Sequence, residues 1–381
     1  MSGTKTGRAD YVKKLEGPKS KGESVLVAIS GGVDSSVAAL LLKKLGYEVV
    51  TTTFWLWDYP NSPGYQGKEN ACCSLDTAEI VADQLDLPHR KFDLSSEFEA
   101  QVVQPTVDAY LDGVTPNPCA RCNRLVRFDL LLEKAEELGF DRIATGHYVR
   151  TEKRSGKWRL LRGLDPEKDQ SYFLYGLGQD ELGRAIFPVG NYRKEEIYDI
   201  AREEDLVSAD VEESQDLCFV PGGDYRDFLE SEVGRAIKEG DIVDTEGNKL
   251  GRHNGLPFYT VGQRKGLGLE TNRAYYVVEM NREDNELVVG SESDLYSSGL
   301  VAGGNNWISG SPPDKGTFSV KIRYRARPVK AEVEFGPEEF YVDFARPQKS
   351  VTPGQIAALY EGDELLGGGV IRKVMGEEKD L

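Results

Sequence analysis

Small and hydroxyl-bearing residues near the start of the chain form a segment whose chemistry suits an anion. Ser30-Gly31-Gly32-Val33-Asp34-Ser35-Ser36 directly follows the apolar residues Ala28 and Ile29 and precedes a helical run. Small residues let the backbone approach an anion, and a helix N-terminus supplies unpaired N–H groups and a positive dipole end. We therefore predict a phosphate-binding loop, although a Gly-Gly turn with polar caps could also be only a connection between strand and helix. The lysine of G-x-x-x-x-G-K-[ST] and the pattern G-x-G-x-x-G are both absent, which excludes the usual NTPase and dinucleotide loops.

Cysteines are the second group of residues with distinctive chemistry. The chain has five, which are Cys72, Cys73, Cys119, Cys122 and Cys218. Their odd number does not fit a disulfide-stapled secreted scaffold, and in a reducing compartment metal binding or thiol chemistry is the more usual role. We expect Cys72 and Cys73 to be structural, so the other three need a chemical explanation.

Two of these three cysteines share one short segment. Asn117-Pro118-Cys119-Ala120-Arg121-Cys122-Asn123 lies between predicted helices, and its prolines predict an extended backbone with a helix N-terminus directly after it. A cysteine there, beside arginines, would have a lowered pKa and could act as a nucleophile or a metal ligand. Cys218 lies much further along the chain, where its neighbours could bring it to the same site. Many isolated cysteines are small buried hydrophobes, but a C-x-x-C between prolines is a poor core element.

A glycine ends a later predicted strand. In Ala144-Thr145-Gly146-His147-Tyr148 the backbone could approach a nucleotide at the carboxyl edge of a parallel sheet. For His147, a satisfied polar residue at a strand end and a catalytic role are both open, and we do not assign it as a general base.

The elements that would position these residues alternate between strands and helices. SVLVAIS is typical of a strand, SVAALLLKKLG of a helix and EVVTTTF of a second strand. The alternation continues through a helical DTAEIVADQLDL, a strand near His89, a long helical stretch past Ser96, a helix RLVRFDLLLEKAEEL and a strand RIATG. It predicts an α/β domain with a parallel sheet covered by helices on both faces.

Changes in polarity, periodicity and the frequency of turn residues along the chain predict four segments. Residues 1–22 are polar and without periodicity, as expected of a flexible leader, and residues 23–208 form the nucleotide-binding domain. Frequent turn signals predict a small central domain over residues 209–290. In residues 291–381 the runs FSVKIRYRA, KAEVEF and EFYVDFA alternate at period two, which predicts a small β-barrel or sandwich.

The composition limits where the chain can act. Its 47 basic and 64 acidic side chains give a formal net charge of −17, which argues against a uniformly basic nucleic-acid coat and against adsorption to anionic membranes. Any phosphate-binding surface must therefore be local. No apolar run is long enough for a membrane span and no secretory signal is evident, so we expect a cytoplasmic protein with no membrane partner.

The phosphate loop resembles that of the PP-loop ATP pyrophosphatase superfamily, which has an adenine nucleotide alpha hydrolase-like fold. Nearly the whole chain is similar to the tRNA-specific 2-thiouridylase family, through the strings SGGVDSS, NPCARCNRLVRF, ATGHYV, KDQSYFLY, FPVGNYRKEEI, SQDLCFV and YTVGQRKGLG. The resemblance implies an ATP-dependent tRNA-uridine 2-sulfurtransferase that also uses Mg²⁺. Such an enzyme adenylates the C2 oxygen of wobble uridine 34 and replaces it with sulfur, giving 2-thiouridine, AMP and pyrophosphate.

The same resemblance assigns residues to roles. Asp34, Cys122 and Cys218 would be catalytic: Cys218 receives persulfide sulfur, and Cys122 faces the activated uridine and releases the sulfur through a disulfide to Cys218. ATP would contact the phosphate loop with Ala28 and Ile29, together with Phe54 and Gly146. Contacts with the anticodon arm of tRNA are implied for Asn117, Pro118, Cys119, His147, Lys168, Asp169, Gln170, Arg264, Lys265, Arg323, Tyr324, Arg325 and Gln355.

Some of these tRNA contacts have plainer interpretations. Lys168-Asp169-Gln170 could be a solvated charged loop. We predict Arg323, Arg325 and Arg327 at alternate positions of one strand, with Tyr324 turned the other way. Such a row is either a basic face for phosphates or merely the solvent side of the strand.

One residue departs from the best-known members of the family, in which an Asp occupies the position of Cys119. The thiolates of Cys119, Cys122 and Cys218 could therefore hold a [4Fe-4S] cluster whose open iron binds sulfide. Zinc is a weaker option, since only one C-x-x-C is present. The sulfur source is accordingly either a persulfide donor, such as a cysteine desulfurase or a sulfur-relay protein, or inorganic sulfide.

Two other functions stay open on the sequence alone. An amide-forming ligase or another PP-loop tRNA-modifying enzyme would share the phosphate loop but would not need three placed cysteines. A non-catalytic RNA-binding protein could keep the fold as a scaffold, although the intact loop argues against it. Sulfur in the product and tRNA-stimulated formation of AMP would separate these functions.

Overall fold

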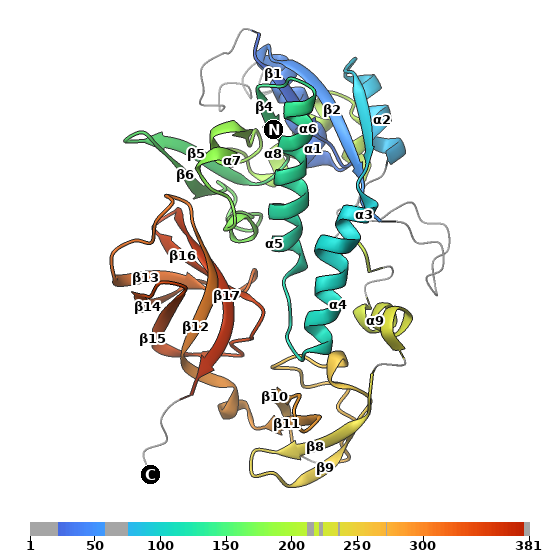
Figure 1. Cartoon of the computed structure of the whole chain (residues 1–381). Coiled ribbons are helices and arrows are strands. Elements are labelled where there is room, and N and C mark those ends of the chain that lie inside the picture. The colour runs from blue at the N-terminus through green and yellow to red at the C-terminus, as the bar shows by residue number, and fades with distance from the viewer. Residues whose placement is uncertain are drawn as a thin grey trace, which may run out of the picture.

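A computed structural model describes residues 22–57, 75–211, 217–220, 224–234, 237–271 and 273–376. Cys72 and Cys73 lie outside these residues, as does nearly all of the predicted leader. The chain folds into a parallel-sheet domain, a central domain and a C-terminal barrel (Figure 1), which confirms the predicted fold class. No helix of the described residues is long and apolar enough to cross a membrane.

Five parallel strands form the sheet of the N-terminal domain, in the order β3-β2-β1-β4-β7. They are β1 (Ser24–Ala28), β2 (Glu48–Trp55), β3 (His89–Asp93), β4 (Arg142–Ala144) and β7 (Ala185–Ile186). The central β1 is inaccessible at Val25, Leu26 and Val27. Because helices cover both sides of this strand, its sequence is a continuous apolar run and does not alternate.

Helices cover both faces of the sheet, as the alternation predicted. α1 (Val33–Leu45), α2 (Leu75–Gln84) and α8 (Lys194–Glu203) pack in one apolar cluster with Val25 and Val27. α6 (Asp129–Glu137) packs on the opposite face, in the cluster that holds Leu26.

Two long helical segments run from the sheet toward the central domain (Figure 1). The first joins α3 (Ser95–Phe98) through a π-helical turn, Glu99–Val103, to α4 (Gln104–Leu111). The second joins α5 (Pro118–Cys122) through a π-helical turn, Asn123–Phe128, to α6. Insertions of this kind into α-helices are frequent at functional sites, and the second begins directly after Cys122.

A hairpin of the N-terminal domain joins the barrel. β5 (Val149–Arg154) pairs with β6 (Lys157–Arg162), and β6 continues the pairing to β17 of the barrel at Leu160 and Leu161. The helix α7 (Gln179–Arg184) lies beside β6. This hairpin and the six strands of the barrel therefore share one sheet of eight strands.

The central domain combines α9 (Tyr225–Val233) with a four-stranded sheet in the order β10-β11-β8-β9. Its strands are β8 (Gly240–Asp244), β9 (Lys249–His253), β10 (Tyr276–Asn281) and β11 (Glu286–Gly290).

Six antiparallel strands form the C-terminal barrel. They are β12 (Tyr296–Trp307), β13 (Gly316–Lys321), β14 (Val329–Phe335), β15 (Glu339–Lys349), β16 (Ile356–Glu361) and β17 (Glu364–Met375). β12 pairs with both β15 and β17, which closes the barrel. Val320, Val333 and Val342 are buried in it, so the period-two pattern separates inward from outward residues as predicted.

The prediction that Arg323, Arg325 and Arg327 share one strand is wrong. β13 ends at Lys321, and the following residues form a turn in which the Ala326 N–H donates to the Arg323 carbonyl (3.1 Å). Pro328 has no N–H to offer a ladder, so the strand does not extend to it even though the alternation of residue types continues. The three arginines are nevertheless exposed.

Candidate active site

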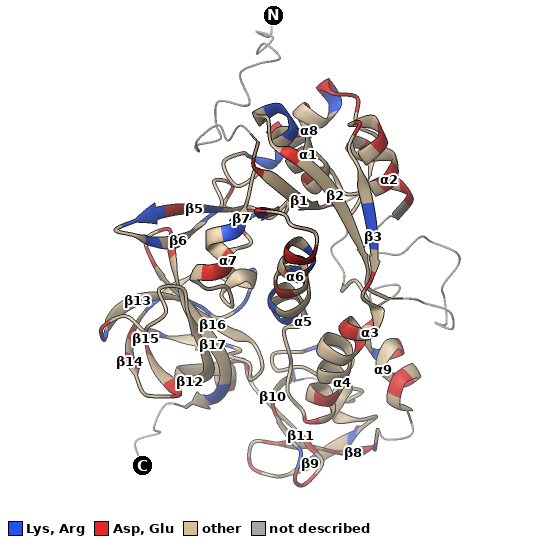
Figure 2. Ribbon diagram, turned by 45° about the horizontal axis from the view of Figure 1, so that its top comes forward, with Lys and Arg blue, Asp and Glu red and all other residues tan. Residues whose placement is uncertain are grey.

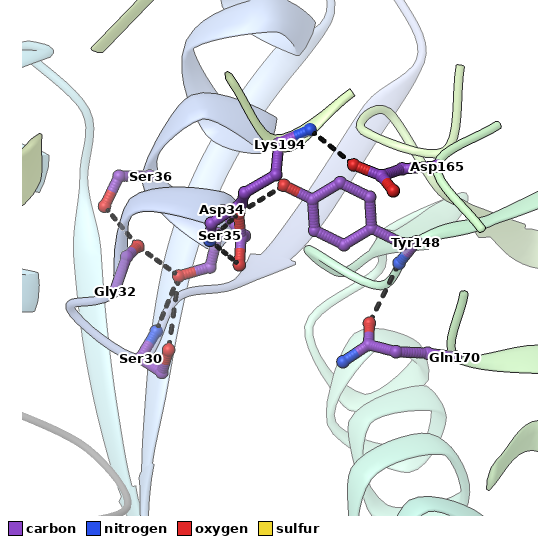
Figure 3. Close-up of polar contacts among 9 residues, drawn as sticks. All are labelled: Ser30, Gly32, Asp34, Ser35, Ser36, Tyr148, Asp165, Gln170 and Lys194. Carbon is purple, nitrogen blue, oxygen red and sulfur yellow. Dashed lines mark hydrogen bonds and ion pairs between the residues drawn. The ribbon is translucent and has the colours of Figure 1, made fainter. Parts of the chain in front are cut away.

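The phosphate loop (residues 30–36) leaves the end of β1 and enters α1 (Figure 3). Gly31 has a φ of 82°, a left-handed conformation that favours glycine. The Ser35 hydroxyl accepts from the Ser30 N–H (3.1 Å) and donates to the Gly32 carbonyl (3.1 Å), and the Ser36 hydroxyl donates to the same carbonyl (2.9 Å). These bonds fold the loop over the N-terminus of α1, where an anion is favoured.

The end of β4 touches this loop backbone to backbone. A Cβ at Gly146 would lie 2.7 Å from the Ser35 nitrogen and 2.9 Å from the Asp34 carbonyl carbon. Those distances are too short for any side chain, so the close approach requires glycine at this position.

A cavity opens between the loop and the carboxyl ends of β1, β2 and β4, where a parallel sheet commonly binds its ligand. Of the predicted site residues, those that line it are Ala28, Ile29, Ser30, Gly32, Asp34, Ser35, Phe54, Gly146, His147 and Gln170. Of the predicted loop, Gly31, Val33 and Ser36 are not in the lining. The predicted nucleotide residues thus converge on one cavity.

Sequence reasoning missed four residues of the lining, namely Thr52, Leu56, Arg127 and Thr145. The buried Thr52 hydroxyl has no hydrogen-bond partner among the described residues, so it offers a polar contact to a ligand in the cavity. Thr52 follows the β-rich run of the second strand and could have been found from its place at the strand end. No sequence pattern pointed to Arg127, because it lies on a helix far from the phosphate loop in sequence.

Asp34 is held by two side chains from other elements (Figure 3). The Lys194 ammonium donates to both carboxylate oxygens, at 2.7 and 2.8 Å, and the Tyr148 hydroxyl donates to Oδ1 at 2.6 Å. Lys194 is 8% exposed and opens α8, which packs against α1. Sequence reasoning missed both partners. They fix the orientation of the carboxylate beside the cavity.

His147 is neutral in this site. Burial and the nearby charge of Arg127 lower the pKa of His147 to about 3. Its Nδ1 is 2.9 Å from the Thr145 hydroxyl, and its ring lies against Phe128. The side chain therefore offers hydrogen bonds at neutral pH and carries no charge there.

The segment with two cysteines is helical, not extended as its prolines predicted. Pro118 is the first residue of α5, a position where a missing N–H costs nothing, and the Asn117 side chain caps the helix by accepting from the Ala120 N–H (3.1 Å). Cys119 is exposed in the first turn, whereas Cys122 is 5% exposed and packs in the core.

Cys218 lies in the same region of the molecule. It is half-buried against the apolar cluster that includes Cys122. The next residue, Phe219, packs on Phe98 with ring centroids 5.9 Å apart, and the π-helical turn after Phe98 contacts α5. Long-range packing thus places Cys218 in the same apolar cluster as Cys122, and a shared site for the three cysteines stays a prediction.

The described residues contain no group of three or more His, Cys, Asp or Glu side chains arranged to hold a metal ion. The donor set proposed for an iron-sulfur cluster, Cys119, Cys122 and Cys218, is therefore not assembled. Cys119 is exposed while Cys122 is inside the core, which separates their environments.

Comparison with known proteins decides the family. The chain is 47% identical to the tRNA-specific 2-thiouridylase MnmA of Carboxydothermus hydrogenoformans over 358 residues, which cover 92% of this chain and 98% of that protein. The chain belongs to the tRNA-specific 2-thiouridylase family. The protein of the same name from Geotalea uraniireducens is 45% identical, over 92% of this chain and 95% of its own length.

Three domain families match this 2-thiouridylase family member in order. They are described as tRNA methyl transferase HUP domain over residues 23–222, tRNA methyl transferase PRC-barrel domain over residues 226–291 and aminomethyltransferase beta-barrel domain over residues 297–371. Among solved structures, the U34-tRNA thiolase NcsA from Methanococcus maripaludis with its [4Fe-4S] cluster is 19% identical with a TM-score of 0.36, over 59% of this chain and 73% of that chain.

The tRNA contacts predicted for this family member divide into two groups. Arg264, Lys265, Arg323 and Arg325 are exposed, and Tyr324 packs inward on Phe173 with ring centroids 4.4 Å apart. Of the other predicted contacts, Lys168, Asp169, Gln170 and Gln355 are less exposed.

Lys168 is half-buried, and the Asp169 carboxylate is buried and accepts from the N–H groups of Gly163 and Ser171. The Gln170 side chain accepts from the Tyr148 N–H (2.9 Å) at the cavity. In the barrel, Gln355 donates to two carbonyls of the segment before α5.

Proposed function

We propose that this chain is an ATP-dependent tRNA-uridine 2-sulfurtransferase that converts wobble uridine 34 to 2-thiouridine. The observation that carries the proposal is the continuity of one helix. Cys122 ends α5, and Arg127, five positions later in the same helical segment, lines the cavity beside the phosphate loop. At the α-helical rise five positions would span roughly 7.5 Å along the axis, and the π-helical turn between them makes the span shorter, so it is comparable to the size of one nucleobase. The relatives that carry the name 2-thiouridylase support the same activity.

ATP is the nucleotide that we propose for the cavity. Its phosphates would lie over residues 30–36 at the N-terminus of α1, and its adenosine would lie against Phe54 and Gly146. Mg²⁺ usually binds through phosphates and one or two carboxylates, and Asp34 supplies a carboxylate in the described lining. The ion would screen phosphate charge during adenylation.

In the first step, the C2 oxygen of uridine attacks the α-phosphorus of ATP, and pyrophosphate leaves. The base releases its N3 proton to solvent water as the new P–O bond forms and the bond from the α-phosphorus to pyrophosphate breaks. Arg127 would stabilise the negative charge that develops on the phosphate, and the neutral His147 would orient the reacting groups by hydrogen bonding.

In the second step, sulfur replaces the activated oxygen. A persulfide on Cys218, delivered by a cysteine desulfurase or a sulfur-relay protein, attacks C2 with its terminal sulfur, and AMP leaves. The Cys122 thiolate then attacks the Cys218 sulfur, which forms a Cys122–Cys218 disulfide and releases 2-thiouridine, which regains its N3 proton. An external thiol reductant regenerates both cysteines.

The anticodon arm of tRNA is the proposed macromolecular partner. Arg264, Lys265, Arg323 and Arg325 would contact its phosphates, and a splayed uridine would enter between the cavity and Cys122.

The test is a thiolation assay with ATP, a persulfide donor and unmodified tRNA, read by nucleoside mass spectrometry together with AMP formation. We expect Asp34→Ala to lose both AMP and 2-thiouridine. Cys122→Ala should lose 2-thiouridine but still form AMP, and both variants should bind tRNA. Thiolation by Cys122→Ala would remove that cysteine from the mechanism, and no tRNA-stimulated AMP from the wild-type protein would contradict the proposal as a whole.

Sulfide bound by a [4Fe-4S] cluster is the alternative sulfur source. Because the three cysteines do not form a metal-binding group, we route no step through it. We expect anaerobically purified protein to contain no stoichiometric iron, and Cys119→Ala to thiolate tRNA from a persulfide donor. About four irons per chain, with activity lost in Cys119→Ala, would overturn the persulfide relay.

A further inference from the structure

A loop of the barrel hydrogen-bonds to the segment directly before α5, the helix that carries Cys119 and Cys122. Gln355 lies in the loop between β15 and β16, and its amide nitrogen donates to the carbonyls of Thr115 and Pro116, at 3.1 Å each. These residues come one and two positions before Asn117, which caps α5. In the same place the Thr115 N–H donates to the Pro353 carbonyl (3.2 Å).

The barrel loop lies close to the segment before α5, and its backbone is hydrogen-bonded to β17. A Cβ at Gly354, where φ is 91°, would lie 2.6 Å from the Thr115 carbonyl oxygen, so the two backbones are in direct contact. Gln355 itself is fixed to β17, because its carbonyl accepts from the Ile371 N–H at 2.7 Å. Because its backbone is fixed in this way, Gln355 couples the position of the barrel to the segment that its side chain binds.

A second contact joins the barrel to a helix beside α5. The Tyr172 hydroxyl donates to the Ile356 carbonyl (3.2 Å), one residue after Gln355. The Ile356 N–H in turn donates to the Tyr172 hydroxyl (3.3 Å), and Tyr172 is fully buried. The short 3-10 helix Ser171–Leu174 that carries Tyr172 also contacts α5, so the barrel reaches this helix through Gln355 and through the neighbourhood of Tyr172.

We propose that Gln355 is a positioning residue, through which the C-terminal barrel holds the helix that carries Cys119 and Cys122 in place for sulfur transfer. This inference rests on the proposed function, because it assigns the barrel to the second step of that reaction. It differs from the role that family resemblance implied for Gln355, a contact with tRNA. The amide nitrogen is already engaged by two protein carbonyls.

The test uses Gln355→Glu in the full-length protein. A carboxylate has the same shape as the amide but has no hydrogen to donate, so it would repel the Thr115 and Pro116 carbonyls. Gln355→Ala serves as a second variant if the carboxylate prevents folding. The matched control is Gln179→Glu, because the Gln179 amide donates to the Ile308 carbonyl (2.6 Å) across the same two domains but on α7, away from the cysteine helix.

The first readout is the ratio of AMP to 2-thiouridine formed. We expect Gln355→Glu to lower the turnover number for 2-thiouridine by about 10-fold or more, since small misplacements of reacting groups have effects of that size. AMP formation should fall by less than 2-thiouridine formation, because Arg127 lies further along the helical segment than the cysteines, so the ratio of AMP to 2-thiouridine rises. The KM for tRNA should stay within about twofold of wild type. Gln179→Glu should keep the wild-type ratio.

The second readout does not depend on the reaction. The rate at which iodoacetamide alkylates the exposed Cys119, followed by mass spectrometry in the protein alone, should change by about threefold or more in Gln355→Glu but not in Gln179→Glu. If the wild-type protein makes no 2-thiouridine, the proposed function fails. The alkylation rate would still show whether the Gln355 hydrogen bonds hold α5 in position.

Two results would overturn the inference. An unchanged product ratio together with an unchanged alkylation rate would show that the barrel does not position the helix. A weaker affinity for tRNA with a normal product ratio would make Gln355 an RNA contact instead.

Discussion

Asp34 depends on a partner from another part of the fold. Lys194 binds both of its carboxylate oxygens and comes from a residue 160 positions away. Because Lys194 is nearly buried, Lys194→Met would leave the partly buried carboxylate with only the Tyr148 hydroxyl of its two described donors. We expect the free energy of unfolding to fall by about 2 kcal/mol, between the costs of an exposed and a fully buried pair, since removing one partner of a partly buried ion pair strands the other.

A double-mutant cycle separates this pair from general damage. Lys194→Met combined with Asp34→Asn should be less destabilised than the sum of the two single variants, by about 1 kcal/mol or more, in urea unfolding. Additive effects would mean that the ion pair contributes nothing to stability.

His147 links stability to pH. Its pKa is about 3 in the folded protein and near 6.5 when the chain is unfolded, so the unfolded state binds more protons between these values. Stability from this group is therefore fully present above pH 6.5 and falls as the pH drops toward 3, with a slope of up to about 1.4 kcal/mol per pH unit. In His147→Gln the free energy of unfolding, measured with denaturant at about pH 4 to 7, should fall less steeply as the pH is lowered. The same slope in both proteins would show that His147 is not held neutral.

At the scale of elements, the junction of the phosphate loop with β4 is the tightest contact of the site. Gly146→Ala would place a Cβ 2.7 Å from the Ser35 nitrogen, and neither backbone can yield without moving the loop. We expect the affinity for a non-hydrolysable ATP analogue to fall by about tenfold or more, because the donors at the helix N-terminus would be displaced. Calorimetric titration measures this affinity.

The control is Gly234→Ala at the end of α9. A Cβ there meets no atom within 4 Å, and the backbone is already right-handed helical with a φ of −42°. It should bind the analogue as the wild type does. Equal affinity in Gly146→Ala would mean that the loop has room to move without loss of the anion site.

At the scale of the whole molecule, an acidic protein must bind a polyanion through a local basic surface. The formal net charge is −17, and Figure 2 shows acidic residues spread over outer helices such as α2, α4 and α9. We expect Arg323→Gln and Arg325→Gln each to weaken tRNA binding and to reduce the slope of log affinity against log salt by up to about 1. The matched control is Arg346→Gln, on the exposed side of β15.

Filter binding at several salt concentrations measures these slopes. If Arg346→Gln changes the slope as much as the other two, the turn between β13 and β14 is not the specific contact. The turn would then be an ordinary exposed loop of the barrel.

The sequence alone determined the features that depend on neighbouring residues. The phosphate loop, the alternation of strands and helices along the chain and the period-two strands of the barrel all follow from local residue type, because backbone conformation and hydrophobic alternation are set within a few positions. Local pattern also misled in two places. The prolines around Cys119 begin a helix and do not extend the chain, and the alternation around Arg323 runs on into a turn.

Only the tertiary structure decided which distant residues meet. Lys194 on Asp34, Arg127 in the cavity and Gln355 on the segment before α5 each join residues far apart in sequence. The same packing leaves Cys119 exposed and encloses Cys122, although both belong to one C-x-x-C. Such pairings depend on how whole helices and strands pack across the sheet and on the docking of the barrel, which no short stretch of sequence encodes.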